Sequence, residues 1–256
     1  MAVPMNPKIA FALLVLGLTS SIVPAADKTD TASTGRKEIN VLIVGGGSSH
    51  DFEKWFHKAD SETLSKLPGV KTSYTSKPGE VAAQLPKLDV LVQTSNQPFD
   101  GAELREGIFE FAKAGKGLVL VHPAIWYNWK DWPEYNKTLV GGGSRGHDKL
   151  GEFEVTVEVP THPLMIGVPT KFRIVDELYY FQKADGGTPI EVLATGKSPI
   201  NGKVYPVVWV TKHAQAPIAC ITLGHDGRAH ELEAYQRLLQ NSVTWAAGKQ
   251  VHPKKD

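Results

Sequence analysis

The fold of this chain follows from the stretch Ile39-Asn-Val-Leu-Ile-Val44 and the three glycines after it, Gly45 to Gly47. The stretch is almost entirely apolar and rich in β-branched residues, which is typical of a strand buried on both faces. Neither a Lys-Ser/Thr pair nor a G-x-G-x-x-G pattern accompanies the glycines, so no nucleotide cofactor is expected. The glycines instead let the backbone turn tightly and approach a ligand closely.

The strand pattern repeats along the first half of the chain. Residues 70–74 predict a weak second strand, and apolar runs at 88–93 and 117–122 predict two more buried strands. Apolar residues at helical spacing lie between them, at 52–67 and 104–112. Strands and helices that alternate in this way predict an α/β fold, with a mainly parallel sheet and helices on both faces.

The second half of the chain has a different pattern. Residues 151–159 alternate between apolar and polar, which predicts a sheet segment with one face in water. A last helix is predicted over 232–245, and no internal repeat or linker interrupts residues 38–249, which we therefore assign to one domain with a short tail, 250–256. Further strands are predicted at 172–180, 190–194, 206–211 and 217–223.

The first 25 residues have the composition of a secretory signal peptide. Lys8 precedes an apolar run at 9–23, and small residues follow, with a cleavage site between Ala25 and Ala26. The apolar run is shorter than the roughly 20 residues that span a bilayer, which argues against a membrane anchor. Residues 26–37 are typical of a flexible leader. We therefore expect a periplasmic or secreted protein that is free of the membrane once the signal is removed.

The charge balance limits the classes of binding partner, and the cysteine content limits the possible disulfides. Lys8 is the only charged residue of the signal segment, so basic and acidic residues are equal in number in the remainder. This balance gives no support to nucleic acid or an anionic membrane as a partner. Cys220 is the only cysteine, which excludes an intrachain disulfide, and its apolar surroundings predict a buried, unreactive thiol. Assembly into a homo-oligomer stays open.

Histidines gather where the predicted strands end. His50 follows the glycine turn after the first strand, His122 ends the run at 117–122, and His225 follows the final strand. His147 lies in a glycine-rich segment that we expect to be a flexible loop. One such histidine alone is more often a loop residue that makes hydrogen bonds. Because ligands of open parallel sheets bind beyond the carboxyl ends of the strands, the convergence of all four favours a functional site.

Neutral imidazoles suit two kinds of chemistry. They can hold a divalent metal such as zinc, for which His50, His122, His147 and His225 are the candidates. They can equally act as general acids and bases near neutral pH. No HxH or HExxH spacing favours the metal, so both interpretations stay open.

Aromatic residues follow His122 closely, with Trp126, Tyr127, Trp129 and Trp132 all within ten residues of it. Flat rings beside polar groups suit the apolar faces and hydroxyl groups of sugars. The alternative is that these rings cover the core beneath a long loop.

Several short motifs run in order along the chain: Val41-Leu-Ile-Val-Gly-Gly-Gly-Ser-Ser-His-Asp51, Leu88-Asp-Val-Leu-Val92, Gly117-Leu-Val-Leu-Val-His122, Thr161-His-Pro163, Asp176-Glu-Leu-Tyr179, Pro206-Val-Val-Trp209 and Leu223-Gly-His-Asp226. This ordered set resembles the ThuA-like (trehalose utilisation) family over roughly residues 38–248. The resemblance implies a flavodoxin-like fold of the class I glutamine amidotransferase type and a link to carbohydrate metabolism.

Glutamine amidotransferases of this type carry a nucleophilic cysteine in a tight G-x-C-x-G turn between strand and helix. His122 stands near that position here, and the flanking glycines are absent. The later His-Pro-Glu of these enzymes is replaced by His225-Asp226-Gly227, and Cys220 lies inside a predicted strand. We therefore expect no glutamine hydrolysis by a Cys-His-Glu triad.

These observations lead to one functional hypothesis and one alternative. We expect an exported hydrolase, lyase or isomerase that acts on a small sugar or keto-sugar derivative, with His122 and His225 as the acid/base or metal-binding pair and Glu177 as the carboxylate. The alternative is a non-catalytic sugar-binding or scaffold domain. The residues expected to contact the substrate are His50, Asp51, Trp126, His147, Tyr179 and Asp226.

Overall fold

The computed structural model describes residues 38–126 and 131–252, and these residues fall in one compact unit. The predicted signal peptide (1–25) and leader (26–37) lie outside the described residues, as do the final residues of the predicted tail. In the described part of the chain, no helix has both the length and the apolar character that a membrane crossing requires.

The described residues contain eleven strands, which we list in chain order: β1 (Ile39–Val44), β2 (Val70–Thr75), β3 (Val90–Gln93), β4 (Gly117–Val121), β5 (Gly142–His147), β6 (Gly151–Val157), β7 (Lys171–Asp176), β8 (Tyr179–Lys183), β9 (Ile190–Lys197), β10 (Val204–Thr211) and β11 (Ile218–Ile221). Nine of them form one sheet in the order β2-β1-β3-β4-β11-β10-β9-β6-β7. The strands from β2 to β11 in this order are parallel, and those from β11 to β7 are antiparallel. β5 and β8 form a separate antiparallel pair.

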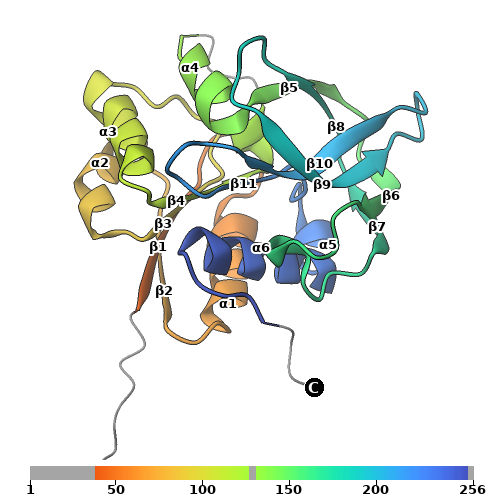
Figure 1. Ribbon diagram of the computed structural model, residues 1–256, viewed down its shortest axis with the longest axis horizontal. Coiled ribbons are helices and arrows are strands. Elements are labelled where there is room, and N and C mark those ends of the chain that lie inside the picture. The colour runs from red at the N-terminus through yellow and green to blue at the C-terminus, as the bar shows by residue number, and fades with distance from the viewer. Residues whose placement is uncertain (1–37, 127–130, 253–256) are drawn as a thin grey trace, which may run out of the picture. The chain divides into compact units, whose positions relative to one another are not determined.

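Helices cover both faces of the parallel strands, as predicted from the alternation of strands and helices. One layer contains α1 (Asp60–Ser65), the π-helical turn Glu53–Ala59 before it, α5 (Gly227–His230) and α6 (Glu233–Ala246). The opposite layer contains α2 (Val81–Gln84), α3 (Ala102–Lys113) and α4 (Pro133–Tyr135). Figure 1 shows these two groups of helices on opposite sides of β1, β3 and β4.

The continuous apolar runs of the first half of the chain form strands that are buried on both faces, as predicted. β3 and β4 are buried along their whole length and β1 nearly so, because side chains on both faces pack against helices. Cys220 lies in β11 and is fully buried. Burial raises the pKa of its thiol to about 12, so the thiol is protonated and unreactive at neutral pH, as predicted.

Two segments differ from the sequence-based expectation. The single strand predicted at 172–180 is broken, because β7 ends at Asp176 and β8 begins at Tyr179, in a different sheet. Glu177 therefore lies in the turn between two sheets. The glycine-rich segment, predicted as a flexible loop, forms β5 instead, because its backbone pairs with β8. A side chain on Gly142 would collide with the Gln182 carbonyl, which explains the need for glycine there.

Candidate functional site

His122 occupies a strained turn at the carboxyl end of β4. Its φ of +46° makes it the only non-glycine residue with a positive φ in the part of the chain that the structure describes. A short helical turn, His122–Ile125, follows directly. In strand-turn-helix sites, a strained turn of this kind presents the reactive side chain. The glycines that flank the cysteine of an amidotransferase turn are absent here. His122 nevertheless adopts a left-handed backbone conformation, and it presents an imidazole where those enzymes present a thiol.

The His122 ring is buried with one nitrogen engaged and the other free. Nδ1 lies 2.6 Å from the Thr222 carbonyl oxygen, which can only accept, so Nδ1 carries the hydrogen and Nε2 the lone pair. Nε2 is buried and has no hydrogen-bond partner among the residues that the structure describes. Burial, the nearby His50 and His225 shift the pKa of His122 well below 6.5, so the ring is neutral near neutral pH. A metal-binding histidine commonly has this arrangement, in which the second ring nitrogen donates to a carbonyl.

Four potential ligand atoms converge at this edge of the sheet, one each from His50, His122, Glu177 and His225, all within 4.8 Å of one another. His225 Nδ1 lies 3.2 Å from Glu177 Oε2 and 3.2 Å from His50 Nε2. His122 Nε2 lies 3.8 Å from Glu177 Oε2. Each residue follows the end of a different strand. His50, His122 and His225 follow strands of the parallel part, whose carboxyl ends share one edge, and Glu177 comes from the turn after β7 in the antiparallel part.

Neighbouring groups shift the pKa values of His50 and His225 in opposite directions. Burial and the neighbouring His225 lower the pKa of His50 to about 4. The hydrogen bond to Glu177 raises the pKa of His225 above 6.5. Ser49 Oγ accepts a hydrogen bond from the Asn96 amide and lies 2.5 Å from His50 Nδ1, which orients the ring.

Asp176 holds the two turns of the site together, and the sequence alone did not assign it a role. Its buried carboxylate accepts hydrogen bonds from the backbone N–H groups of Glu177 (2.7 Å), Gly224 (2.7 Å) and His225 (3.2 Å). Burial raises the pKa of this carboxyl to about 6, against the opposite effect of these hydrogen bonds. Its only signal in the sequence is its place in the motif Asp176-Glu-Leu-Tyr179.

A cavity of about 210 Å³ opens beside the four ligand atoms. His147 lines it, and its Nδ1 lies 3.5 Å from Glu177 Oε1 and 2.7 Å from the Asp148 carbonyl oxygen. The fourth ligand atom of the cluster thus comes from Glu177, and His147 stands next to it. His122 lies beneath the cavity and does not line it. The lining residues are Ser49, His50, Asn96, Pro123, Trp126, His147, Glu177, Tyr179 and His225.

Aromatic rings form one wall of this cavity. The ring centroids of Trp126 lie 5.4 Å from His147 and 5.2 Å from Tyr179. The Tyr179 ring in turn packs at 4.6 Å on His122. Trp132 belongs to the buried core beside Tyr135, as the alternative interpretation of this aromatic segment expects. Trp126 lines the cavity, and its contact with a sugar stays a prediction. Tyr127 and Trp129 lie outside the described residues.

Two aspartates that we expected to contact the substrate lie outside the cavity lining. The Asp51 carboxylate accepts a hydrogen bond from the Lys54 backbone N–H at 3.0 Å, at the start of the helical segment after β1. Asp226 is the N-cap of α5, where it accepts from the Arg228 backbone N–H at 2.9 Å and pairs with the Arg228 side chain. The structure thus gives both carboxylates a partner at a helix start.

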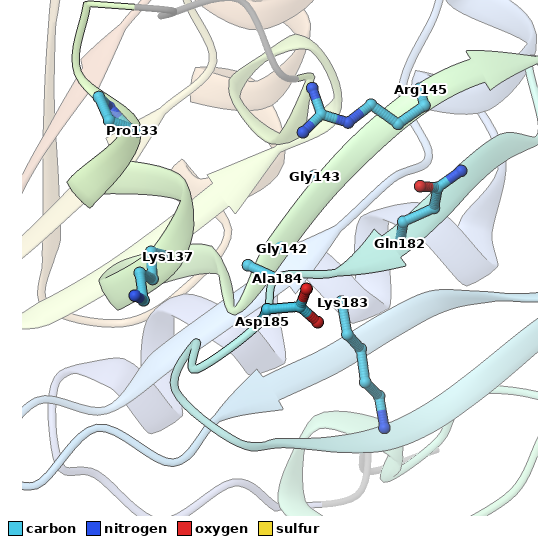
Figure 2. Close-up of a pocket in the computed structure, with 9 residues that line it drawn as sticks. All are labelled: Pro133, Lys137, Gly142, Gly143, Arg145, Gln182, Lys183, Ala184 and Asp185. Atoms are coloured by element: carbon cyan, nitrogen blue, oxygen red, sulfur yellow. The ribbon is translucent and has the colours of Figure 1, made fainter.

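A second cavity, of about 320 Å³, lies along the β5–β8 pair. Figure 2 shows Lys137, Arg145, Lys183 and Asp185 around it, with Gly142 and Gly143 between them. None of the residues predicted to carry chemistry lines this cavity. Its basic side chains distinguish it from the histidine site, where the acid Glu177 faces imidazoles.

Comparisons with known proteins agree with this architecture. The family model described as "Trehalose utilisation" (ThuA) matches residues 40–246. A ThuA-like protein from Parabacteroides merdae superimposes with a TM-score of 0.74 at 21% identity, over 86% of this chain and 94% of the other. A ThuA-like protein from Bacteroides uniformis gives a TM-score of 0.71 at 20% identity, over 86% and 96%.

A more distant likeness concerns the amidotransferase fold. The glutaminase domain of CTPS from Trypanosoma brucei, solved with acivicin, superimposes with a TM-score of 0.50 at 8% identity, over 83% of this chain and 95% of the other. This likeness shows the class I glutamine amidotransferase-like fold and nothing about activity. A search of curated protein sequences finds no match. Since the family model spans nearly all of the described residues, the chain belongs to the ThuA family, which associates it with the use of carbohydrates.

Proposed function

We propose that this protein is an exported carbohydrate-processing enzyme in which His50, His122, His225 and Glu177 hold a divalent metal such as zinc. The observation that carries the proposal is the convergence of four ligand atoms within 4.8 Å. His122 Nε2 is buried, and no described residue offers it a hydrogen bond, which is explained if its lone pair binds a cation. The predicted signal peptide supports export to the periplasm or medium.

The spacing of the donor atoms suits zinc. With zinc–nitrogen and zinc–oxygen bonds of about 2.0–2.1 Å, a tetrahedral site requires donor atoms about 3.4 Å apart. Three of the six separations between the donor atoms, 3.2, 3.2 and 3.8 Å, lie near this value, and all six are within 4.8 Å. The donor set of imidazoles and a carboxylate is one that zinc binds.

The cavity suits a sugar next to such a centre. A bound divalent metal would act as a Lewis acid toward a sugar carbonyl or hydroxyl oxygen. Trp126 and Tyr179 offer ring surfaces for the apolar face of a sugar. His147, half exposed at the cavity, is placed to exchange a proton with the substrate, and Glu177 Oε1 lies 3.5 Å from its ring.

A metal-free acid/base enzyme is the second candidate, and one observation favours it. Glu177, His225 and His50 form a chain of contacts in which the pKa of His225 is raised and that of His50 is lowered to about 4. Two neighbouring groups with pKa values pushed apart can serve as acid and base in the same reaction. The metal content of the protein separates the two candidates.

The decisive experiment measures metal content and zinc affinity of the secreted protein, wild type against His122→Ala. We expect near-stoichiometric metal in the wild type and zinc affinity about 100-fold lower or worse in the variant, because one ligand is lost. His57→Ala, on the partly exposed helical segment after β1, is the matched control and should bind zinc like the wild type. Wild-type protein that binds no zinc and keeps its activity in chelator would overturn the metal proposal and leave the acid/base one.

The substrate class is tested by binding and turnover of disaccharides and their keto derivatives. Trp126→Ala should weaken binding about fivefold, since an aromatic contact contributes on the order of 1 kcal/mol. Sugar binding without turnover, unaffected by His122→Ala or His225→Ala, would contradict an enzyme and identify a sugar-binding domain.

A further inference from the structure

A fifth histidine lies behind the site, in the layer of α5 and α6. His230 is fully buried, and its Nδ1 lies 2.7 Å from Asp60 Oδ1. Its Nε2 lies 3.1 Å from the carbonyl oxygen of Gly224. Asp60, on α1, is equally buried, and its other oxygen accepts a hydrogen bond from the Tyr235 hydroxyl at 3.2 Å. The function proposed above uses none of these three side chains.

The partners of His230 determine how many protons its ring carries. A carbonyl oxygen can only accept, and so can an ionised carboxylate. Both ring nitrogens of His230 therefore face acceptors, and a neutral ring would point a lone pair at one of them. A ring with hydrogens on both nitrogens satisfies both oxygens, and the charge of Asp60 balances the resulting positive charge in the interior.

The surroundings agree with this protonation. Burial by itself lowers the pKa of His230, but the charge of Asp60 and the hydrogen bonds to Asp60 and Gly224 raise it above 6.5. The aromatic rings of Trp55, Phe56 and Tyr235 fill the space around the imidazole. The other titratable groups on this side are Asp176 at the end of β7, His50 after β1 and His122 after β4.

Gly224 connects this pair to the site. Its N–H donates to Asp176 and its carbonyl accepts from His230, so its peptide groups are held from both sides. Its φ is +124°, and a side chain there would lie 3.3 Å from the Tyr235 hydroxyl, so the position requires glycine. The next residue is His225, whose ring makes the contacts with Glu177 and His50.

We propose that His230 is a positioning residue: a buried imidazolium, paired with Asp60, that fixes the Gly224–His225 turn through the Gly224 carbonyl and thereby orients His225. The role of His225 in chemistry rests on the function proposed above. The protonation of His230 and its hold on the turn do not depend on that function, so they can be tested separately.

The first test counts the protons on the ring. Long-range ¹H–¹⁵N NMR spectra of the full mature protein should give protonated nitrogen signals for both His230 nitrogens near neutral pH, assigned through their loss in His230→Gln. His122, with one free nitrogen, provides the internal contrast of a neutral ring. A neutral tautomer of His230 near neutral pH would overturn the proposal. The variant serves only to assign the signals, and the measurement on the wild type does not depend on metal or activity.

The second test uses two variants that each keep one half of the contact. The amide nitrogen of Gln matches imidazole Nε2, so His230→Gln retains a donor for Gly224, whereas Asn matches Nδ1 and His230→Asn retains only the donor for Asp60. We expect His225 amide and ring NMR signals near their wild-type positions in His230→Gln and displaced in His230→Asn. His230→Asn should lower zinc affinity or kcat by about tenfold at most, the lower end of the cost for groups that hydrogen-bond to metal ligands, because His230 acts on His225 only through Gly224. His230→Gln should lower them much less.

Equal effects of the two variants on the His225 signals would overturn the positioning role, because a merely structural histidine would not distinguish its two nitrogens. If the wild type binds neither zinc nor sugar, the proposed function fails, while the His225 signals and the proton count of His230 still decide this inference.

Discussion

His122 and His230 are both buried histidines close to one edge of the sheet, yet His122 is neutral and the positive form is favoured at His230. His122 donates from one nitrogen to the Thr222 carbonyl, its other nitrogen has no hydrogen-bond partner in the described part of the chain, and burial keeps the ring neutral. His230 has the Asp60 carboxylate on one nitrogen and the Gly224 carbonyl on the other, and its pKa is raised.

The difference shows that burial alone does not set the charge of a histidine. The loss of water disfavours the imidazolium at both positions, and the partner atoms decide which position overcomes that loss. The free lone pair of His122 is available to a metal or a proton, whereas both ring nitrogens of His230 are occupied. His122 is therefore suited to bind a metal or a proton, and His230 is suited to hold the Gly224–His225 turn in place.

The largest expected effect is on stability and comes from removing the Asp60 carboxylate, which pairs with His230 and has no counterpart at His122. Asp60→Ala leaves His230 without its counter-charge in the interior, and we expect a loss of about 3–5 kcal/mol in the free energy of unfolding. Urea denaturation measures it, with the exposed Glu62→Ala on the same helix as control, expected within about 0.5 kcal/mol.

The same prediction has a pH dependence. The folded-state pKa of His230 is raised above its unfolded value, so the stabilisation by the pair is fully present below about pH 6.5. It is lost as the pH rises through the folded-state pKa, and the gap between wild type and Asp60→Ala should narrow there. Equal stability of Asp60→Ala and Glu62→Ala at mildly acidic pH would contradict the assignment.

A second prediction concerns zinc affinity as a function of pH. Protons compete with the metal for imidazole, and the pKa of His225 is raised, while that of His50 is about 4 and that of His122 is well below 6.5. Below the pKa of His225, affinity should therefore fall about tenfold per pH unit, since only one histidine takes up a proton. Calorimetric titrations from about pH 5.5 to 8 check this, and a steeper slope would mean that several imidazoles titrate together.

A smaller change is expected when Glu177 loses its charge. Its hydrogen bond is the largest cause of the raised pKa of His225, so Glu177→Gln should lower that pKa in the metal-free protein. An NMR pH titration of the His225 ring measures the shift. Glu152→Gln, at an exposed pair with Arg173 on β6 and β7, should leave it unchanged. An unchanged pKa in Glu177→Gln would show that another group holds the His225 proton.

The smallest effect is expected at Asp226. Asn is as good an N-cap as Asp, so Asp226→Asn should alter stability by about 0.5 kcal/mol or less and leave zinc and sugar binding as in the wild type. Thermal denaturation and the binding measurements above check this. A marked loss of sugar affinity would return Asp226 to the substrate contacts that the sequence predicts.

Several features of the site could be predicted because they follow from local patterns. The apolar runs predicted β1, β3 and β4, and the rule that ligands bind at the carboxyl ends of parallel strands selected His50, His122 and His225. The prediction of a flexible loop for the glycine-rich segment is wrong, because its pairing with β8 depends on residues about 35 positions away. Asp51 and Asp226 follow strand ends as the histidines do, and only the atoms around them reveal that they serve helix starts.

The order of hydrophobic and polar residues along the chain was sufficient for the α/β fold, the family and the unreactive Cys220, because these depend on periodicity and on short motifs. The strained turn at His122, the role of Asp176 and the His230–Asp60 pair depend on contacts between residues that are 48 to 170 positions apart. Charge states of buried groups are set by such contacts, since each partner atom within hydrogen-bond distance shifts the balance between burial and ionisation. Only the folded chain brings those atoms together.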